Sequence, residues 1–180
     1  MMITVLTASP RDDKKSISKR MVFEFLEKKI LDKKSNDKKF KDADVHFIDT
    51  YKYSVQPCIH CAHCKKVFEC IYDDDYAIYD DAFNNSDILI FATPVYCLSF
   101  PSTLKAVLDR MQKYFEAKYS LGIKQPVAKH KDAYLIASSG SCSDRGVKIM
   151  EEQLSLVFRA INAELKDTIF RLDTDKYNML

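Results

Sequence analysis

The stretch Ile88-Leu-Ile-Phe-Ala-Thr-Pro-Val-Tyr96 decides the fold of this 180-residue chain. It opens with an unbroken apolar run and turns at Pro94. Strands of a parallel sheet have such runs when helices cover both of their faces. We therefore predict a buried central strand over Ile88–Thr93, with a loop at its carboxyl end.

Segments with the pattern of strands and helices alternate on both sides of this strand. Four further strands are predicted, over Met2–Leu6, around Val45 and Phe47, over Ala133–Ala137 and over Leu165–Leu172. Helices are predicted between them from the following residues: Ile17, Met21, Val22, Phe25 and Ile30, with Ser16 or Ser18 as N-cap; Tyr76–Phe83; Leu104, Val107, Leu108, Met111 and Phe115; Val147, Met150, Leu154, Val157 and Ile161. This order predicts an α/β fold in which residues 1–180 form a single domain, a doubly wound parallel sheet with helices on both faces.

Composition and charge argue against several classes of protein. A hydrophobic content of 47% and a charged content of 30% are typical of globular proteins, and no apolar run is long enough to span a membrane. The formal net charge of +2 gives no reason to expect a nucleic acid partner. No signal peptide is recognisable, so we expect a cytoplasmic protein. A lysine cluster over 28–41 and an aspartate cluster over 73–81 are expected to be solvated.

Ligands of doubly wound sheets bind at the carboxyl ends of the strands, so the loops there are the candidate sites. The loop over 7–18 carries Arg11 and ends in a serine-rich helix start. Hydroxyls and free N–H groups at a helix start can bind phosphate, although such serines can also be caps only. In the loop after the central strand, Tyr96 could border a flat ligand or could pack in the core.

Three motifs carry a family resemblance. They are Ser9-Pro-Arg11 after the first strand; Thr93-Pro-Val-Tyr96, followed by Leu-Lys and Asp-Arg, after the third; and Cys-x2-Cys-x2-Cys-x5-Cys over Cys58–Cys70, followed by Asp-Asp. Together they resemble the NADPH-dependent FMN reductase family, and within it the iron-sulfur flavoprotein branch. The resemblance runs from Ile3 to about Gly140. It implies a flavodoxin-like fold with strand order 2-1-3-4-5, a bound FMN and a homodimer or homotetramer.

The resemblance also assigns residues to parts of FMN. The phosphate would be held by Ser9, Arg11, Ser16, Ile17 and Ser18. The ribityl chain and isoalloxazine would contact Pro94, Val95, Tyr96, Cys97, Leu98 and Ser99, and the pyrimidine end would approach Ser138, Ser139 and Gly140. Two positions depart from the family, because Ala8 and His60 stand where it usually has glycine.

Four cysteines, Cys58, Cys61, Cys64 and Cys70, form a second candidate site. In a chain without a recognisable secretory signal, such a group indicates reduced thiols, metal ligands or catalysis. Successive spacings of three favour a loop around a [4Fe-4S] cluster over a zinc site. The loop contains no glycine, and its histidines add bulk, so structural or redox-active thiols remain the alternative.

The resemblance implies a flavoenzyme with NAD(P)H as cosubstrate. Reduced flavin would pass electrons to a quinone, a nitro or azo compound, free flavin or a protein. Because the cofactor carries the chemistry, no catalytic side chain is predicted. Donors of Ser138, Ser139 and Gly140 would stabilise negative charge on the reduced ring, and Tyr96 would form a wall of the pocket. Two alternatives are an FMN electron carrier without enzymatic activity and a flavin-free module whose cysteines sense thiols or metals.

Overall fold

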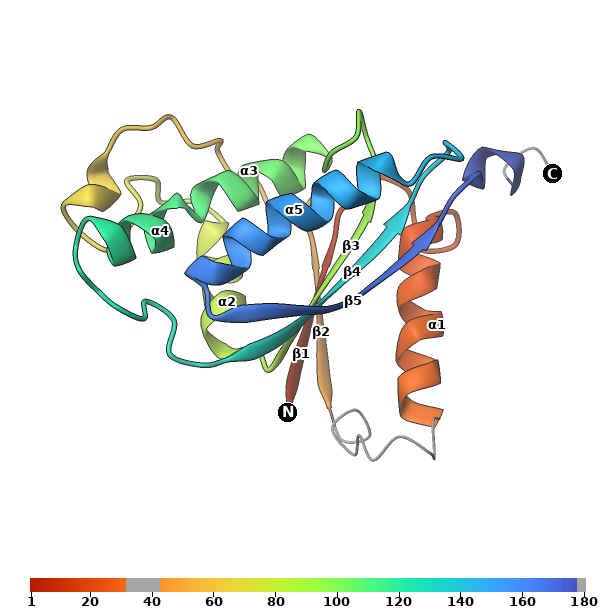
Figure 1. The fold of residues 1–180 in the computed structure, drawn as a ribbon, viewed down its shortest axis with the longest axis horizontal. Helices are drawn as coiled ribbons and strands as arrows, with labels where there is room; N and C mark the ends of the chain where they lie inside the picture. Colours follow the sequence, from red (N-terminus) through yellow and green to blue (C-terminus); the bar gives the residue numbers. More distant parts are fainter. Residues whose placement is uncertain (32–42, 178–180) are drawn as a thin grey trace.

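The computed structural model describes residues 1–31 and 43–177, and its five strands form one parallel sheet. The strands lie in the order β2-β1-β3-β4-β5, which confirms the predicted topology (Figure 1). Their bounds are β1 Met2–Thr7, β2 Asp44–Asp49, β3 Ile88–Pro94, β4 Lys131–Ser138 and β5 Ala163–Arg171.

Strand β3 is central and buried, as the sequence predicts. It pairs with β1 on one side and with β4 on the other. Because successive side chains of a strand point to opposite faces, Ile88 and Ile90 enter one apolar core while Leu89 and Phe91 enter the other. The sheet is therefore covered on both faces, as its unbroken apolar run requires.

The helices divide unequally between the two faces. Helix α1 (Ile17–Leu31) packs on one face, where Met21, Val22 and Phe25 meet β1, β3 and β4. The other face carries α2 (Tyr76–Asn85), α3 (Ser102–Arg110), α4 (Gln112–Tyr119) and α5 (Arg145–Ala160) (Figure 1). Helices on both faces are thus confirmed.

The helix predicted to continue through Phe115 is interrupted at Met111. This residue has ψ −5°, far from the value of about −42° in an α-helix. The interruption turns Tyr114 and Ala117 of α4 into the core, while Phe115 is 45% exposed. The prediction of one continuous helix through Phe115 is therefore wrong.

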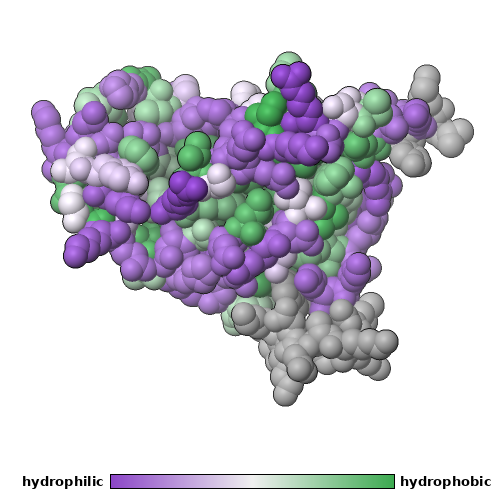
Figure 2. All heavy atoms as spheres, viewed as in Figure 1, coloured by the Kyte–Doolittle hydropathy of each residue, from purple (hydrophilic) through white to green (hydrophobic). Residues whose placement is uncertain are grey.

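The outer strands are less buried than the centre. In β2, Ile48 is buried, whereas Phe47 is 47% exposed and stacks on Phe23 with ring centroids 5.7 Å apart. The outward surface of the α5 side is mostly hydrophilic, with apolar patches between polar side chains (Figure 2). Phe47 is one of the apolar residues left at an edge, because β2 is an outer strand of the described sheet.

Part of the predicted lysine cluster lies outside the described residues, namely Lys33, Lys34, Lys38, Lys39 and Lys41. The side chain of Ile30 also lies outside them. Across 1–31 and 43–177, no helix combines the length and the apolar character that crossing a membrane requires.

Candidate functional site

Loops from separate parts of the chain meet at the carboxyl edge of the sheet and line a pocket of about 100 Å³. They follow β1, β3, β4 and β5. The lining residues that the sequence predicts are Ser9, Arg11, Ser16, Ile17, Ser18, Pro94, Val95, Tyr96, Ser138 and Gly140; Thr174 and Asp175 join them. The structure therefore brings most of the predicted flavin residues to one place.

The start of helix α1 lines one part of this pocket through Ser16, Ile17 and Ser18. Ser16 is its N-cap, because its Oγ accepts a hydrogen bond from the N–H of Lys19 at 3.3 Å. The hydroxyls of Ser16 and Ser18 lie 3.3 Å apart and are buried, as is Ser9. The first N–H groups of a helix have no partner within it and carry a partial positive charge. Together with Arg11, this end of the pocket is suited to an anion such as phosphate.

A tight turn follows β3. Tyr96 and Ser99 exchange two backbone hydrogen bonds of 2.9 Å, and the residues between them, Cys97 and Leu98, have φ of 49° and 63°. Left-handed backbone at two non-glycine residues is strained and is found most often at functional sites. Cys97, Leu98 and Ser99 form this turn rather than the pocket lining. Tyr96 is 45% exposed, so it does not pack in the core.

Helix α5 supports this turn through Gly146. A Cβ atom at this position would lie 2.5 Å from Cγ1 of Val95 and 3.2 Å from Cα of Leu98. Only a residue without a side chain allows the helix to approach so closely. The N–H of Val95 also donates to the carbonyl oxygen of Ser138 at 2.8 Å, which joins the loops after β3 and β4.

The loop after β4 is joined to the end of β5. The N–H of Ser139 donates to the carbonyl oxygen of Arg171 at 2.9 Å, so this N–H is not available to a flavin. The Ser139 Oγ accepts from the N–H of Ser141 at 3.2 Å. Ser139 is buried behind the pocket wall and does not line it.

Thr174 and Asp175 are the pocket residues that the sequence reasoning missed. They belong to a short 3₁₀ helix, η3 (Thr174–Tyr177), whose first N–H donates to the carbonyl oxygen of Ser139 at 3.0 Å. The Asp175 carboxylate lies where a Cβ on Gly140 would be. The available signal was topological, because the segment after the fifth strand must emerge at the same edge as the other loops.

The four cysteines lie in the connection between β2 and α2, at the far end of α3. Cys58, Cys61, Cys64 and Cys70 line a small pocket of about 30 Å³, and their neighbours there include His60, His63, Arg110 and Lys113. All four are free thiols. Among the described residues, no three His, Cys, Asp or Glu side chains are arranged to hold a metal ion. The loop gathers the thiols without assembling them as ligands.

The curved path of this loop places two residues in left-handed backbone. His60 has φ 54° and Ala62, which precedes the 3₁₀ helix η2 (His63–Lys65), has φ 61°. Such a conformation costs a residue other than glycine on the order of 1–2 kcal/mol. It is the backbone reason that glycine suits position 60, where the family resemblance expects it.

Charged residues hold the loop against α2 and α3. The Asp74 carboxylate accepts hydrogen bonds from Arg110 at 2.8 and 3.2 Å and from the N–H of Gln56 at 3.0 Å. Asp75 accepts from the N–H of Ser54 at 2.7 Å. Although partial burial would raise the pKa of Asp74, the hydrogen bonds from Arg110 and the backbone lower it overall.

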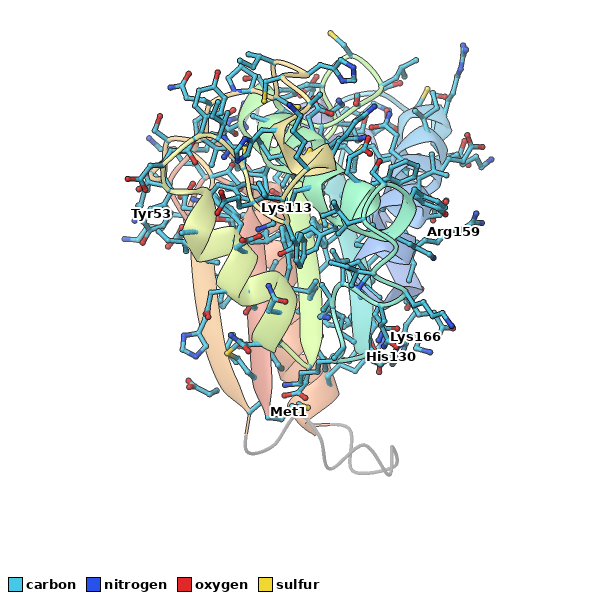
Figure 3. The ribbon with its side chains drawn as sticks, turned by 90° about the vertical axis from the view of Figure 1, so that its left-hand side faces the viewer. Met1, Tyr53, Lys113, His130, Arg159 and Lys166 are labelled. Atoms are coloured by element: carbon cyan, nitrogen blue, oxygen red, sulfur yellow. The ribbon has the colours of Figure 1, made fainter. Side chains whose placement is uncertain are left out.

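A second group of charges fixes α4 beside the loop. Asp80 pairs with Lys113 and accepts a hydrogen bond of 2.5 Å from the Tyr114 hydroxyl. Figure 3 views this end of the molecule, with Lys113 between the helices and Met1 at the opposite end, where the strands begin. The expectation that the aspartate cluster over 73–81 is solvated is therefore wrong for Asp74 and Asp80, whose side chains are 13% and 25% exposed.

Burial also affects one of the cysteines. The pKa of the Cys64 thiol is raised, first by its burial and then by the nearby Glu116 carboxylate. Lys65 lies 3.9 Å from that carboxylate. Without a metal, Cys64 is therefore a protonated and weakly nucleophilic thiol at neutral pH.

Comparison with known sequences agrees with the family resemblance of the sequence motifs. The profile of the NADPH-dependent FMN reductase family matches residues 1–171. An iron-sulfur flavoprotein of Clostridioides difficile (strain 630) is 30% identical over 117 residues, which cover 64% of this chain and 48% of that protein. The chain spans about half the length, or less, of the curated relatives it matches.

Solved structures share the fold at low sequence identity. The azoreductase AzrA has a TM-score of 0.64 and 11% identity, with 99% of this chain and 90% of that chain covered. An NAD(P)H:quinone oxidoreductase from Methanothermobacter marburgensis has a TM-score of 0.62 and 17% identity, with 96% and 82% covered. At such identities the likeness shows the common flavodoxin-like fold.

Proposed function

Because the chain belongs to the NADPH-dependent FMN reductase family, we propose that it is an FMN-dependent oxidoreductase that takes hydride from NAD(P)H. It passes the electrons to a second acceptor: a quinone, a nitro or azo compound, free flavin or a protein. The observation that carries this proposal is the pocket in which residues from the loops after β1, β3 and β4 meet.

The residues of this pocket fit FMN by their chemistry. The buried hydroxyls of Ser16 and Ser18, the start of α1 and Arg11 would hold the phosphate. The pocket volume of about 100 Å³ is below that of a typical small-molecule site, so the flavin ring would extend out of it along Tyr96.

Bound FMN supplies the redox chemistry, and the protein supplies position and electrostatics. The hydroxyl of Ser138, which lines the pocket, would donate toward the pyrimidine end of the ring, where negative charge develops on reduction. Tyr96 would limit access to one face of the ring.

The decisive experiment uses purified protein reconstituted with FMN and mixed anaerobically with NADH or NADPH. We expect flavin absorbance near its visible maximum to bleach rapidly and to recover when a quinone is added. Reduction only by a ferredoxin-type protein would instead favour the electron carrier without enzymatic activity. Failure to retain FMN in excess would overturn the proposal and favour the flavin-free module.

We propose further that the four cysteines hold a [4Fe-4S] cluster. The donor set fits, because four thiolates are the usual ligands of such a cluster, and all four line one pocket. The buried Nε of Arg110, a residue that lines the same pocket, has no hydrogen-bond partner among the described residues and also fits a group rich in acceptor atoms. Since the thiols are not arranged as ligands, loading must draw them together.

Iron and acid-labile sulfide analysis of protein purified without oxygen tests the cluster. We expect four iron and four sulfide per chain, as the proposed cluster formula requires, and their loss when Cys61 and Cys64 are both changed to serine. Zinc in place of iron, or thiols that titrate fully with no metal, would overturn this part of the proposal while leaving the flavin part intact.

Assembly into a homodimer or homotetramer stays a prediction of the family resemblance. Light scattering of the FMN-loaded protein measures it directly. A monomeric mass at micromolar concentration would contradict it.

A further inference from the structure

Two buried polar atoms beside the cysteine pocket have no hydrogen-bond partner among the described residues. They are the Tyr76 hydroxyl and Nε of Arg110. Both residues are almost completely buried, at 3% and 2% exposure. An unsatisfied buried donor costs about 1–3 kcal/mol, so such atoms call for an explanation.

The rest of the Arg110 side chain is held firmly in place. Its other nitrogens bond to Asp74 and to the carbonyl oxygen of Gln56. Its guanidinium stacks between two rings, 4.9 Å from the centroid of Tyr72 and 4.8 Å from that of Tyr76. The Arg110 side chain therefore cannot turn to bring Nε to another acceptor. The stacking on Arg110 also holds the Tyr76 ring in place.

Arg110 lines the pocket together with Cys70, and the Tyr76 ring stacks on the Arg110 guanidinium. Although burial would lower the pKa of Arg110, its hydrogen bonds to Asp74 raise it overall. Burial, and then Tyr114 and Asp80, raise the pKa of Tyr76 well above its usual value. Tyr76 therefore keeps its proton and is a permanent donor beside Arg110, which lines the pocket.

We propose that Tyr76 and Arg110 donate hydrogen bonds to the sulfur atoms of the centre held at Cys70, and that they position this centre and set its redox potential. The inference rests on the proposed iron-sulfur cluster. Hydrogen bonds to cluster sulfurs and adjacent positive charge stabilise the reduced, more negative state. These two residues should therefore raise the potential and slow the loss of metal.

Tyr76→Phe is the main test because it removes one hydroxyl and keeps the stacked ring. We expect a more negative midpoint potential in an anaerobic titration followed by electron paramagnetic resonance. We also expect a severalfold shorter lifetime of the cluster in excess chelator. Both measurements are independent of turnover.

Tyr79→Phe is the matched control. The Tyr79 hydroxyl is also buried without a partner, and its pKa is raised by burial and by Asp49, Asp75 and Tyr53, with no cysteine among the causes. Its removal should leave potential and cluster lifetime unchanged. In metal-free protein, both substitutions should raise the melting temperature, because each deletes an unsatisfied hydroxyl. In loaded protein, only Tyr76→Phe should lower it.

Substitutions of Arg110 complete the test. Arg110→Lys retains the positive charge but replaces the planar guanidinium and its N–H donors with an ammonium group. Arg110→Gln removes the charge. The potential should fall further in Arg110→Gln than in Arg110→Lys. Because Arg110 also holds Asp74, its variants are interpreted only alongside Tyr76→Phe.

The possible outcomes separate this inference from the function on which it rests. Absence of iron and sulfide from the native protein would overturn both. A loaded cluster whose potential and lifetime are the same in the native protein, Tyr76→Phe and Tyr79→Phe would overturn the inference alone. Equal shifts in both tyrosine variants would also overturn it, since they would show a general effect of helix α2.

Discussion

The pocket at the carboxyl edge of the sheet and the cysteine pocket are built in different ways. The pocket at the carboxyl edge of the sheet is made of strand ends and a helix start, so its position follows from the order of the strands. The cysteine pocket lies in an irregular connection, and its walls depend on side chains such as Asp74 and Arg110.

This difference shows where each pocket is vulnerable. The first relies on backbone hydrogen bonds and close packing, which tolerate the loss of most single side chains. The second relies on a few buried charges, and removal of one partner leaves the other without compensation. Changes that affect one pocket and spare the other test this contrast.

The largest effect is expected from Asp74→Asn. It leaves the buried guanidinium of Arg110 without its carboxylate, which we expect to cost about 3–5 kcal/mol of the free energy of unfolding. The exposed neighbour Asp73 provides the control, since Asp73→Asn should cost less than about 0.5 kcal/mol. Denaturant titration measures both, and equal costs would contradict the contrast.

The same pair predicts a pH dependence. The pKa of Asp74 is lower in the folded chain than its ordinary value of 3.8. Its contribution to stability is therefore present above that value and disappears as the pH falls through the folded-state pKa. The difference in stability between the native protein and Asp74→Asn should narrow in acid. FMN binding at neutral pH should stay unchanged in this variant.

Lys131 gives the next effect and belongs to neither pocket. It is buried at the amino edge of the sheet, near the His130 and Lys166 labelled in Figure 3, and donates to the carbonyl oxygen of Ile161 at 3.1 Å. Burial, and then Lys129, lowers its pKa from 10.5 to about 8. The unfolded chain therefore binds more protons between these values, so stability should rise with pH by on the order of 3 kcal/mol.

Urea titrations from pH 8 to 10.5 check this rise, whose bounds are the two pKa values of Lys131. In Lys131→Met the free energy of unfolding should rise with pH by on the order of 3 kcal/mol less than in the native protein. FMN and metal binding should be unaltered. Parallel pH profiles for the two proteins would show that Lys131 is protonated in the fold.

Gly140→Ala should damage the flavin pocket and spare the cysteines. The new methyl group would displace the Asp175 carboxylate and disturb the wall after β4. We expect FMN to bind about tenfold more weakly, a change of about 1.4 kcal/mol. Fluorescence titration with FMN measures it. Restoration of affinity in Gly140→Ala combined with Asp175→Ala would identify the clash as the cause, and no restoration would exclude it.

The smallest effect is expected from Ser16→Ala. Loss of an N-cap costs about 1 kcal/mol of stability, and the phosphate loses one hydroxyl. The control is the exposed Ser155 in α5, where alanine should change neither stability nor FMN affinity. Unaltered FMN affinity in Ser16→Ala would remove this serine from the proposed phosphate site.

The fold can be predicted from the sequence because each strand and helix leaves a local, periodic pattern of apolar residues. The unbroken run in β3 and the helical spacing in α1 and α5 are periodic signals, and the strand order came from the family resemblance. The interruption at Met111 escaped prediction because apolar residues keep helical spacing on both sides of it. No local pattern marks a change of one dihedral angle.

The same reasoning explains which parts of the sites were found. Ser16 and Tyr96 stand in loops that the topology must bring together, so their positions could be predicted. Asp74 and Arg110 are 36 positions apart, and nothing in the spacing of either indicates the other. Asp175 was missed because it follows the last predicted strand, a region that the resemblance does not reach.

Helix α3 joins the two pockets. It starts directly after the turn at Tyr96 and ends at Arg110, so its nine residues form a spacer of about 13 Å. Thermodynamic coupling between the pockets would pass through it. If loading of the cysteines changes the affinity for FMN by some factor, FMN must change the affinity for the metal by the same factor. A factor of one would show that filling either pocket leaves the position of α3 unchanged.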